Sequence, residues 1–218
     1  MGRDARLIVV DFDGTITEDD TLVDMCRRHA PEVFEQVEDD LRAGRITLRE
    51  CIRREFEAIT GDHDEIVRLA VERSVVRAGF ADFVRAAEAT RDRVVVVSAG
   101  FREVIQPVLE REGVGHLELV ANSVQFGPDR TEVRFLHGEG ACDVCGEECK
   151  RAVVRELRDG YATVVYIGDG YSDRCAAMDA DVRFARRGLA RFLDDAGADF
   201  AWFTDFERIT DASSSAGC

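Results

Sequence analysis

The chain has 218 residues, enough for one sizeable domain or for a core domain with a modest insertion. Its 29 basic and 44 acidic residues give a formal net charge of −15, which disfavours nucleic acid and anionic membranes as partners. Small molecules and metal cations are the partners that this charge favours. Only one of the 29 basic residues, Lys150, is a lysine, which makes that position the first candidate for a specific role.

Three apolar runs, each followed by a polar loop, indicate the core of the fold. They are residues 6–10, 94–97 and 163–167. Runs of this length are typical of strands that are buried on both faces of a parallel sheet. Helical patterns follow each run, so the sequence predicts an α/β fold with a doubly wound, Rossmann-like parallel sheet. The polar loops should gather at the carboxyl ends of the strands.

Residues from about 20 to 79 have a different pattern. Cys51, Ile52 and Phe56 recur at helical spacing behind Thr47, which forms a capping-box pattern with Glu50. This stretch predicts a helical insertion without strands. Further along the chain, the alternating stretch 124–136 predicts a hairpin that turns near residues 127–129.

Four aspartates stand at predicted strand ends. Asp11 and Asp13 follow the first run, and Asp169 and Asp173 follow the last. Crowded carboxylates repel one another unless a cation lies between them, and their hard oxygen ligands suit Mg²⁺. The sequence therefore predicts a magnesium site at this edge of the sheet.

Donors suitable for a phosphate group lie at the same predicted edge. Ser98 offers a hydroxyl, Ala99 and Gly100 offer backbone amides, and Lys150 offers an ammonium at the start of a helix. Carboxylates, a metal and a set of phosphate-binding donors are the equipment for phosphoryl transfer. The sequence therefore predicts a site that handles a phosphate ester.

The aspartates can be given roles in this chemistry. Asp11 would attack phosphorus to form an aspartyl-phosphate, and Asp13 would protonate the leaving group and then activate water. Asp11, the backbone carbonyl of Asp13, and Asp169 would hold Mg²⁺. Asp173 would orient either a metal-bound water or Lys150.

The chain resembles the haloacid dehalogenase superfamily of phosphatases. The stretch DFDGTIT at residues 11–17 is similar to its first motif, Ser98 to its second, Lys150 to its third, and residues 168–177 to its fourth. The resemblance implies the roles given above. It also implies a core domain formed by residues 1–16 and 80–218, with a helical cap domain, residues 17–79, inserted over the site.

Within the superfamily the chain is most similar to the branch that holds phosphoserine phosphatase, methionine-salvage enol-phosphate phosphatase and phosphoethanolamine/phosphocholine phosphatase. The first motif and the runs 142–150 and 181–189 resemble the latter two enzymes. Asp20 stands where phosphoserine phosphatases bind the substrate ammonium, and Arg54 stands near their carboxylate-binding arginine. The resemblance implies a methionine-salvage enol phosphate as substrate, with phosphoserine or phosphoethanolamine/phosphocholine as alternatives.

A cysteine-rich segment precedes Lys150. His137, Cys142, Cys145 and Cys149 have the spacing and softness of Zn²⁺ ligands. Either a structural zinc or a group of reduced, packed thiols accounts for this pattern. Three other cysteines fall on apolar helix faces and are predicted to be core thiols: Cys26, Cys51 and Cys175.

Two other classes of function use part of the same constellation. A haloacid dehalogenase would use Asp11 to displace halide, but it needs neither a metal nor the acid Asp13. A non-catalytic phosphoacceptor module shares the acidic pocket and the lysine, but it has no long insertion after its first strand. The polar N-terminus and the absence of a long apolar stretch predict a cytoplasmic enzyme that acts on a small phosphorylated metabolite. The sequence leaves the oligomeric state open.

Overall fold

The computed structural model describes residues 5–136, 142–145 and 149–215. The described strands form one sheet in the order β4-β3-β2-β1-β5-β6-β7. All neighbouring strands in it are parallel except β3 and β4, which are antiparallel. The strands are β1 (Leu7–Val10), β2 (Arg93–Phe101), β3 (Glu118–Gln125), β4 (Glu132–Arg134), β5 (Val164–Gly168), β6 (Val182–Ala185) and β7 (Ala201–Trp202).

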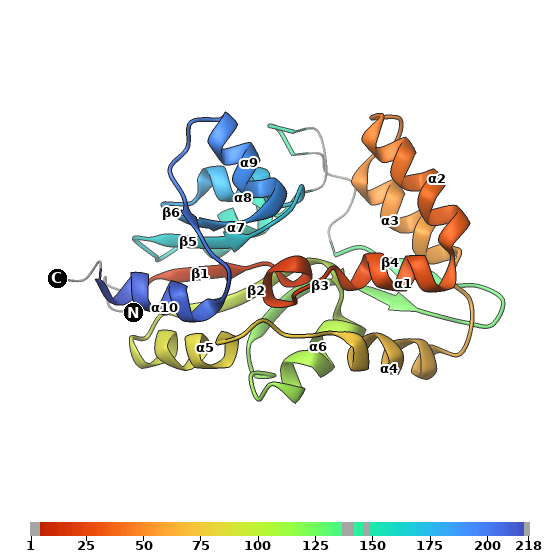
Figure 1. The fold of residues 1–218 in the computed structure, drawn as a ribbon, viewed down its shortest axis with the longest axis horizontal. Coiled ribbons are helices and arrows are strands. Elements are labelled where there is room, and N and C mark those ends of the chain that lie inside the picture. Colours follow the sequence, from red (N-terminus) through yellow and green to blue (C-terminus); the bar gives the residue numbers. More distant parts are fainter. Residues whose placement is uncertain (1–4, 137–141, 146–148, 216–218) are drawn as a thin grey trace.

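Helices cover both faces of this sheet (Figure 1). On one side lie α5 (Phe80–Ala89), α6 (Arg102–Arg111) and α10 (Phe206–Ser215), and on the other lie α7 (Arg151–Leu157), α8 (Arg174–Asp179) and α9 (Arg187–Asp195). Successive side chains of the central strands point alternately to the two helix layers, as β1 shows. Ile8 and Val10 join the apolar cluster under α5 and α6, whereas Leu7 and Val9 join the cluster under α7 to α9.

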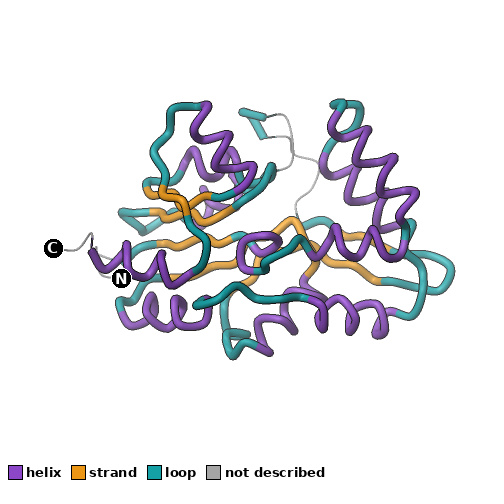
Figure 2. The backbone as a smooth tube through the Cα atoms, viewed as in Figure 1, coloured by secondary structure: helices purple, strands orange, loops and turns teal. Residues whose placement is uncertain are grey.

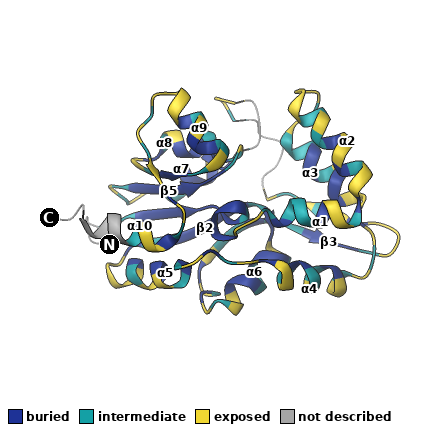
Figure 3. Ribbon diagram, viewed as in Figure 1, coloured by how far each residue is buried: buried dark blue, intermediate teal, exposed yellow. Residues whose placement is uncertain are grey.

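This alternation explains why the strand runs are continuously apolar. Both faces of β1, β2 and β5 are buried between helices, and the strands are dark blue in Figure 3. The predicted α/β fold with a doubly wound parallel sheet is confirmed, and so is the predicted hairpin, which joins β3 to β4. Among the described residues, no helix is long and apolar enough to cross a membrane.

Four helices follow β1 and the short turn η1 (Phe12–Ile16), as Figure 2 shows in purple. They are α1 (Thr21–His29), α2 (Pro31–Arg42), α3 (Leu48–Glu57) and α4 (His63–Arg73), and we call them the helical insertion. Side-chain caps begin three of them: Asp20 accepts a hydrogen bond from the amide of Val23, Thr47 from Glu50, and Asp62 from Glu65.

The insertion is packed onto the sheet edge rather than isolated from it. Phe56 in α3 stacks edge-on against Phe101 of β2, with ring centroids 4.6 Å apart, and Phe126 after β3 joins the same apolar cluster. Helix α4 lies beside α6 under the sheet, whereas α2 and α3 form a pair above its edge (Figure 1). The insertion therefore shares an apolar core with β2 and β3.

The chain enters and leaves the insertion through one narrow neck. Thr17 and Val76 form an isolated antiparallel bridge, and the amide of Glu18 donates to the carbonyl of Val75 at 2.9 Å. Arg77 follows Val76, and its buried guanidinium donates hydrogen bonds across to carbonyl oxygens of the opposite segment, Gly14, Thr15, Thr17 and Glu18, and to that of Thr204. These bonds hold the two ends of the insertion together.

Candidate active site

The candidate site lies at the carboxyl ends of β1, β2 and β5. Asp11 follows β1 and Asp169 follows β5, as the sequence predicts. The secondary structure after Val97 differs from the prediction. Strand β2 continues through Ser98, Ala99 and Gly100 to Phe101 instead of ending in a loop. The pairing of β2 with β3 shifts register between Val97 and Phe101. Such an irregularity changes the direction of side chains within a strand, and here it spans Ser98, whose side chain lies at the site.

The turn η1 brings the first-motif aspartates against the loop after β5. Gly14 has a φ of +74°, and a Cβ at this position would collide with the carboxylate of Asp169. Its amide donates to Thr17 Oγ1 at 3.1 Å, which fixes the turn. A glycine is thus required here both for the backbone conformation and for the close approach of Asp169.

Lys150 links two of the predicted site aspartates. Its side chain is 5% exposed at the N-terminus of α7. Its ammonium donates to Asp11 Oδ1 and to Asp173 Oδ1, the latter at 2.6 Å. Although burial acts in the opposite direction, the charges of Asp11 and Asp173 raise the pKa of Lys150 above its ordinary value. The ammonium therefore stays protonated in the pH range of the cell.

Asp173 is fully buried and its oxygens are well satisfied. Besides Lys150, the hydroxyl of Tyr166 donates to Oδ1 at 2.8 Å. The amides of Asp169 and Gly170 donate to Oδ2 at 3.0 and 2.9 Å. This arrangement fits the predicted role of orienting Lys150. It also fixes the loop that carries Asp169.

Asp11, Asp169 and Asp173 have carboxylate oxygens within 4.8 Å of one another. Burial, followed by the charge of Asp173, raises the pKa of Asp11 well above its usual range and that of Asp169 to about 6. Arg187 lies 3.4 Å from Asp169 and offsets part of the charge. Asp11 and Asp169 also line a cavity, and their crowded oxygen donors fit a divalent cation, since a cation between them removes the repulsion.

Asp13 is set up differently from Asp11. Oδ1 accepts hydrogen bonds from the amide of Thr21 at 3.0 Å and from the hydroxyl of Thr21, and Oδ2 accepts from Ser98 Oγ at 3.3 Å. Burial, followed by the charge of Asp20, raises the pKa of Asp13 to about 7. A carboxyl group with this pKa exchanges protons readily near neutral pH, as a general acid and base must.

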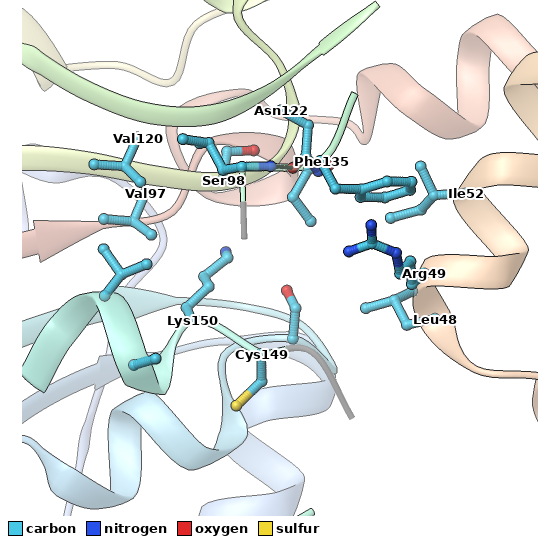
Figure 4. Close-up of a pocket in the computed structure, with 15 residues that line it drawn as sticks. Leu48, Arg49, Ile52, Val97, Ser98, Val120, Asn122, Phe135, Cys149 and Lys150 are labelled. Carbon is cyan, nitrogen blue, oxygen red and sulfur yellow. Dashed lines mark hydrogen bonds between the residues drawn. The ribbon is translucent and has the colours of Figure 1, made fainter. Parts of the chain in front are cut away.

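The predicted phosphate donors are brought together only in part. Lys150 and Ser98 line a shared cavity with Ala99 (Figure 4). The amide of Gly100 donates to Ser98 Oγ at 2.9 Å, so it orients the serine in this structure. A Cβ on Gly100 would lie 2.7 Å from Asp13 Oδ2, which again requires a glycine.

A cavity of about 540 Å³ separates the catalytic edge from the helical insertion. On the sheet side it is lined by Asp11, Asp13, Ser98 and Asp169. On the insertion side three acidic side chains, Asp20, Glu38 and Glu55, line it together with Arg42, which pairs with Glu38 at 2.8 Å, and with apolar residues of α1 to α3. Glu55 is only 6% exposed, and its Oε1 has no hydrogen-bond partner. Burial, followed by the charge of Glu38, raises the pKa of Glu55 to about 7.

A second, smaller cavity of about 100 Å³ adjoins the first at Ser98 (Figure 4). Arg49 of α3 stacks on the ring of Phe135, 4.1 Å from its centroid, on the insertion side of this cavity. Arg54, the predicted carboxylate-binding residue, is elsewhere. Its side chain is 45% exposed and pairs with Glu50 at 2.6 Å, because the apolar stripe of α3 turns it outward. The structure does not bring Arg54 to the site.

Several residues of the site were missed by the sequence analysis. Tyr166 is part of an apolar strand run, so nothing marked its hydroxyl as a partner of Asp173. Thr21 had no distinguishing motif, and Arg187 lies in the run 181–189, which carried a family resemblance but was given no role at the site. Glu55 did carry a signal, since it lies four residues after Cys51 and three after Ile52, on the buried stripe of α3. A glutamate on the apolar face of a helix is a candidate for function.

The structure thus combines a Rossmann-like core, a helical insertion and an aspartate cluster bridged by a lysine. A family model of haloacid dehalogenase-like hydrolases matches residues 8–178. The chain therefore belongs to the haloacid dehalogenase-like hydrolases, and the predicted family and enzyme class are confirmed.

Two curated relatives are named 2-hydroxy-3-keto-5-methylthiopentenyl-1-phosphate phosphatase. The one from an Exiguobacterium species is 30% identical over 212 residues, covering 93% of this chain and 94% of the relative. The one from Geobacillus kaustophilus is 31% identical over 214 residues, covering 94% of each. The solved structure of a substrate-bound phosphoserine phosphatase superimposes with a TM-score of 0.74 over 97% of this chain, at 20% identity. That likeness shows that the two proteins share a fold.

Proposed function

We propose that this protein is a Mg²⁺-dependent phosphatase that hydrolyses a small phosphate monoester through a phosphoaspartyl intermediate. The observation that carries the proposal is the contact of Lys150 with both Asp11 and Asp173 beside an Asp13 whose pKa is raised to about 7. A dehalogenase has no use for the proton on Asp13, and a phosphoacceptor module has no use for a large substrate cavity. Both alternatives leave these features unexplained.

In the first step, a carboxylate oxygen of Asp11 forms a bond to phosphorus as the bond from phosphorus to the leaving oxygen breaks. Protonated Asp13 gives its proton to that oxygen, so the leaving group departs as an alcohol or enol. Lys150 and the hydroxyl of Ser98 donate to the phosphoryl oxygens, where negative charge accumulates in the transition state. Asp173 keeps the ammonium of Lys150 aimed at this group.

In the second step, Asp13 accepts a proton from a water molecule, whose oxygen attacks phosphorus and releases Asp11 as a carboxylate. Asp11, Asp169 and the carbonyl of Asp13 would hold Mg²⁺, which when bound offsets charge on the phosphoryl oxygens. Asp173 was predicted as a further ligand. Because both its oxygens already accept two hydrogen bonds each, we assign it the positioning of Lys150.

The leading substrate is the methionine-salvage enol phosphate named for the relatives from Exiguobacterium and Geobacillus. Identity of about 30% over nearly the full length of both chains supports this choice. We further propose that residues 17–79 act as a cap over the site, with residues 1–16 and 80–218 as the core. The cavity between the insertion and the catalytic edge supports that division, and Asp20 lines it at the start of α1.

The acidic cavity wall favours a second candidate substrate. Arg42 pairs with Glu38, which leaves Asp20 and Glu55 to face the leaving group, and in the enol phosphate that group has no positive charge. A buried glutamate with an unpartnered oxygen is better satisfied by an ammonium or a quaternary amine. Phosphoethanolamine and phosphocholine carry such groups. Phosphoserine has less support, because Arg54 does not line the cavity and Arg42, which does, already pairs with Glu38.

Release of inorganic phosphate from a panel of substrates tests these proposals. The panel contains the enol phosphate, phosphoethanolamine, phosphocholine, phosphoserine and pyridoxal phosphate, each with Mg²⁺ and with excess chelator. We expect turnover only with Mg²⁺, and none in Asp11→Asn. Full turnover in excess chelator, or an active Asp11→Asn, would contradict the mechanism.

The variant Glu55→Gln separates the two substrate candidates. If the leaving group is cationic, KM for phosphoethanolamine or phosphocholine should rise roughly tenfold or more, the cost of losing one charged contact. The same variant should leave KM for the enol phosphate near its wild-type value. The exposed Glu57→Gln in the same helix is the matched control, since its side chain is 45% exposed and pairs with Arg53.

A further inference from the structure

A group of cysteines lies beside the catalytic residues but takes no part in the proposed chemistry. The sulfur atoms of Cys142, Cys145, Cys149 and Cys175 all lie within 4.8 Å of one another. A tetrahedral site with metal–sulfur bonds of about 2.3 Å places its sulfurs roughly 3.8 Å apart. Small side-chain rotations would therefore bring these four sulfurs to the geometry of a tetrahedral metal site.

The ligand set differs from the one that the sequence predicts. His137 lies outside the described residues. Cys175 was predicted to be a core thiol, and it is indeed buried, but its sulfur joins the other three. Helical periodicity placed it correctly on the inner face of α8, but periodicity could not show that the loop before Lys150 packs against that face.

We propose that Cys142, Cys145, Cys149 and Cys175 bind one structural Zn²⁺ ion. Four thiolates complete a tetrahedral shell and leave no open position for a substrate, as in structural zinc sites. The Cys-x2-Cys spacing of Cys142 and Cys145 is typical of the turns that chelate zinc. The proposed Mg²⁺ site has oxygen ligands, whereas this site has sulfur ligands, so each set of ligands favours a different metal.

The surroundings of the sulfurs support a charged metal–thiolate group. The amide of Val144 donates to Cys142 Sγ at 3.5 Å. The guanidinium of Arg151 lies 4.0 Å from the same sulfur and also pairs with Asp143 and Asp179. Zinc with four thiolates carries a formal charge of −2, and a neighbouring arginine and backbone amides offset it.

The position of the proposed site gives it a structural purpose. Cys149 immediately precedes Lys150, and Cys175 lies two residues after Asp173. Lys150 and Asp173 are joined by the 2.6 Å hydrogen bond described above. Zinc would thus fasten the segment that presents the ammonium to the helix that presents its carboxylate partner. The effect on rate rests on the proposed phosphatase function, whereas zinc binding itself does not.

Metal analysis of the full chain, purified in Mg²⁺ buffer, tests the proposal. We expect one zinc ion per chain, and Co²⁺ in its place should give the absorption bands of tetrahedral cobalt with thiolate ligands. Cys145→Ser, at an exposed turn, and Cys175→Ala should each lose most of the bound zinc. Cys175→His should regain it with a shifted cobalt spectrum, because imidazole replaces one thiolate. Cys26→Ala, a core thiol of α1, is the control and should keep the full complement.

Three results would overturn the proposal. They are a wild-type chain that binds no zinc when its thiols are reduced, a disulfide among these cysteines in the protein as isolated, and unchanged zinc binding in both Cys145→Ser and Cys175→Ala. The nucleophile variant Asp11→Asn should retain zinc although it is inactive. Loss of activity and loss of zinc are therefore distinguishable, and a failed phosphatase assay leaves the zinc measurement decisive.

Discussion

Replacing Lys150 by arginine keeps the positive charge but is expected to leave the enzyme close to inactive. The ammonium occupies a buried gap between Asp11 and Asp173, and Tyr166 already contacts the same oxygen of Asp173. An added Cβ on Gly168 would lie 2.7 Å from Asp173 Oδ2, so little free space surrounds that carboxylate. A planar guanidinium is wider than an ammonium and would displace either the substrate or one of the carboxylates.

We estimate the loss as that of one transition-state contact, about 3–4 kcal/mol, or roughly a few hundredfold in kcat. Initial rates at saturating Mg²⁺ on the best substrate of the panel measure it. Arg155→Lys is the matched control, because that side chain is 54% exposed on the same helix and pairs with Asp179. A surface change of this kind should stay within roughly twofold of wild type.

The reasoning is refuted if Lys150→Arg keeps more than about a tenth of wild-type activity, a deficit of only about 1.4 kcal/mol. The phosphate-binding cation would then have to be sought among the arginines, with Arg49 as the first choice. Circular dichroism and a thermal midpoint near that of wild type must show that the variant is folded.

Three further predictions follow from the same site. The rate of hydrolysis of an alkyl phosphate should decline as pH rises through about 7, because Asp13 loses its proton there. The rate with an aryl phosphate, which has a better leaving group, should decline less. Rate–pH profiles on both substrates measure the difference. Gly14→Ala should lower stability by about 1–2 kcal/mol and weaken Mg²⁺ binding, because the methyl group meets Asp169 and the φ of +74° is strained; urea unfolding and metal titration check both. Without Mg²⁺, stability should fall between about pH 4 and 7 and then level off, because Asp169 and Glu55 hold protons in the folded chain that the unfolded chain has already lost. Thermal melts in chelator should show this fall and melts in Mg²⁺ should show less of it, whereas a pH-independent midpoint would contradict it.

Local sequence patterns predicted the parts of this protein that depend on local order. The apolar runs predicted β1, β2 and β5 because both faces of each strand are covered. The polar residues after those runs predicted that Asp11, Ser98 and Asp169 would meet, since the carboxyl ends of parallel strands share one edge. Lys150 stood out because its chemistry differs from that of arginine.

Contacts between distant segments were beyond the same reasoning. The pairing of Tyr166 with Asp173, and of Cys175 with the loop before Lys150, depends on how α7 and α8 pack on the sheet. In the insertion, Arg54 was placed in the site by likeness alone, although the apolar stripe of α3 turns Glu55 inward and Arg54 outward. Had the helical phase of α3 been applied residue by residue, it would have predicted Glu55, rather than Arg54, as the side chain that faces the site.

The neck formed by Thr17, Val76 and Arg77 has a consequence for how such an enzyme diversifies. Because Glu18 and Val75 are hydrogen-bonded neighbours, the helical insertion leaves the core and returns to it at two adjacent points. A segment with adjacent ends can change in length or sequence without moving its points of attachment, as long as the helix faces that pack on β2, β3 and α6 stay apolar. New substrates can thus be acquired by replacing helices at the rim while the reacting aspartates keep their places.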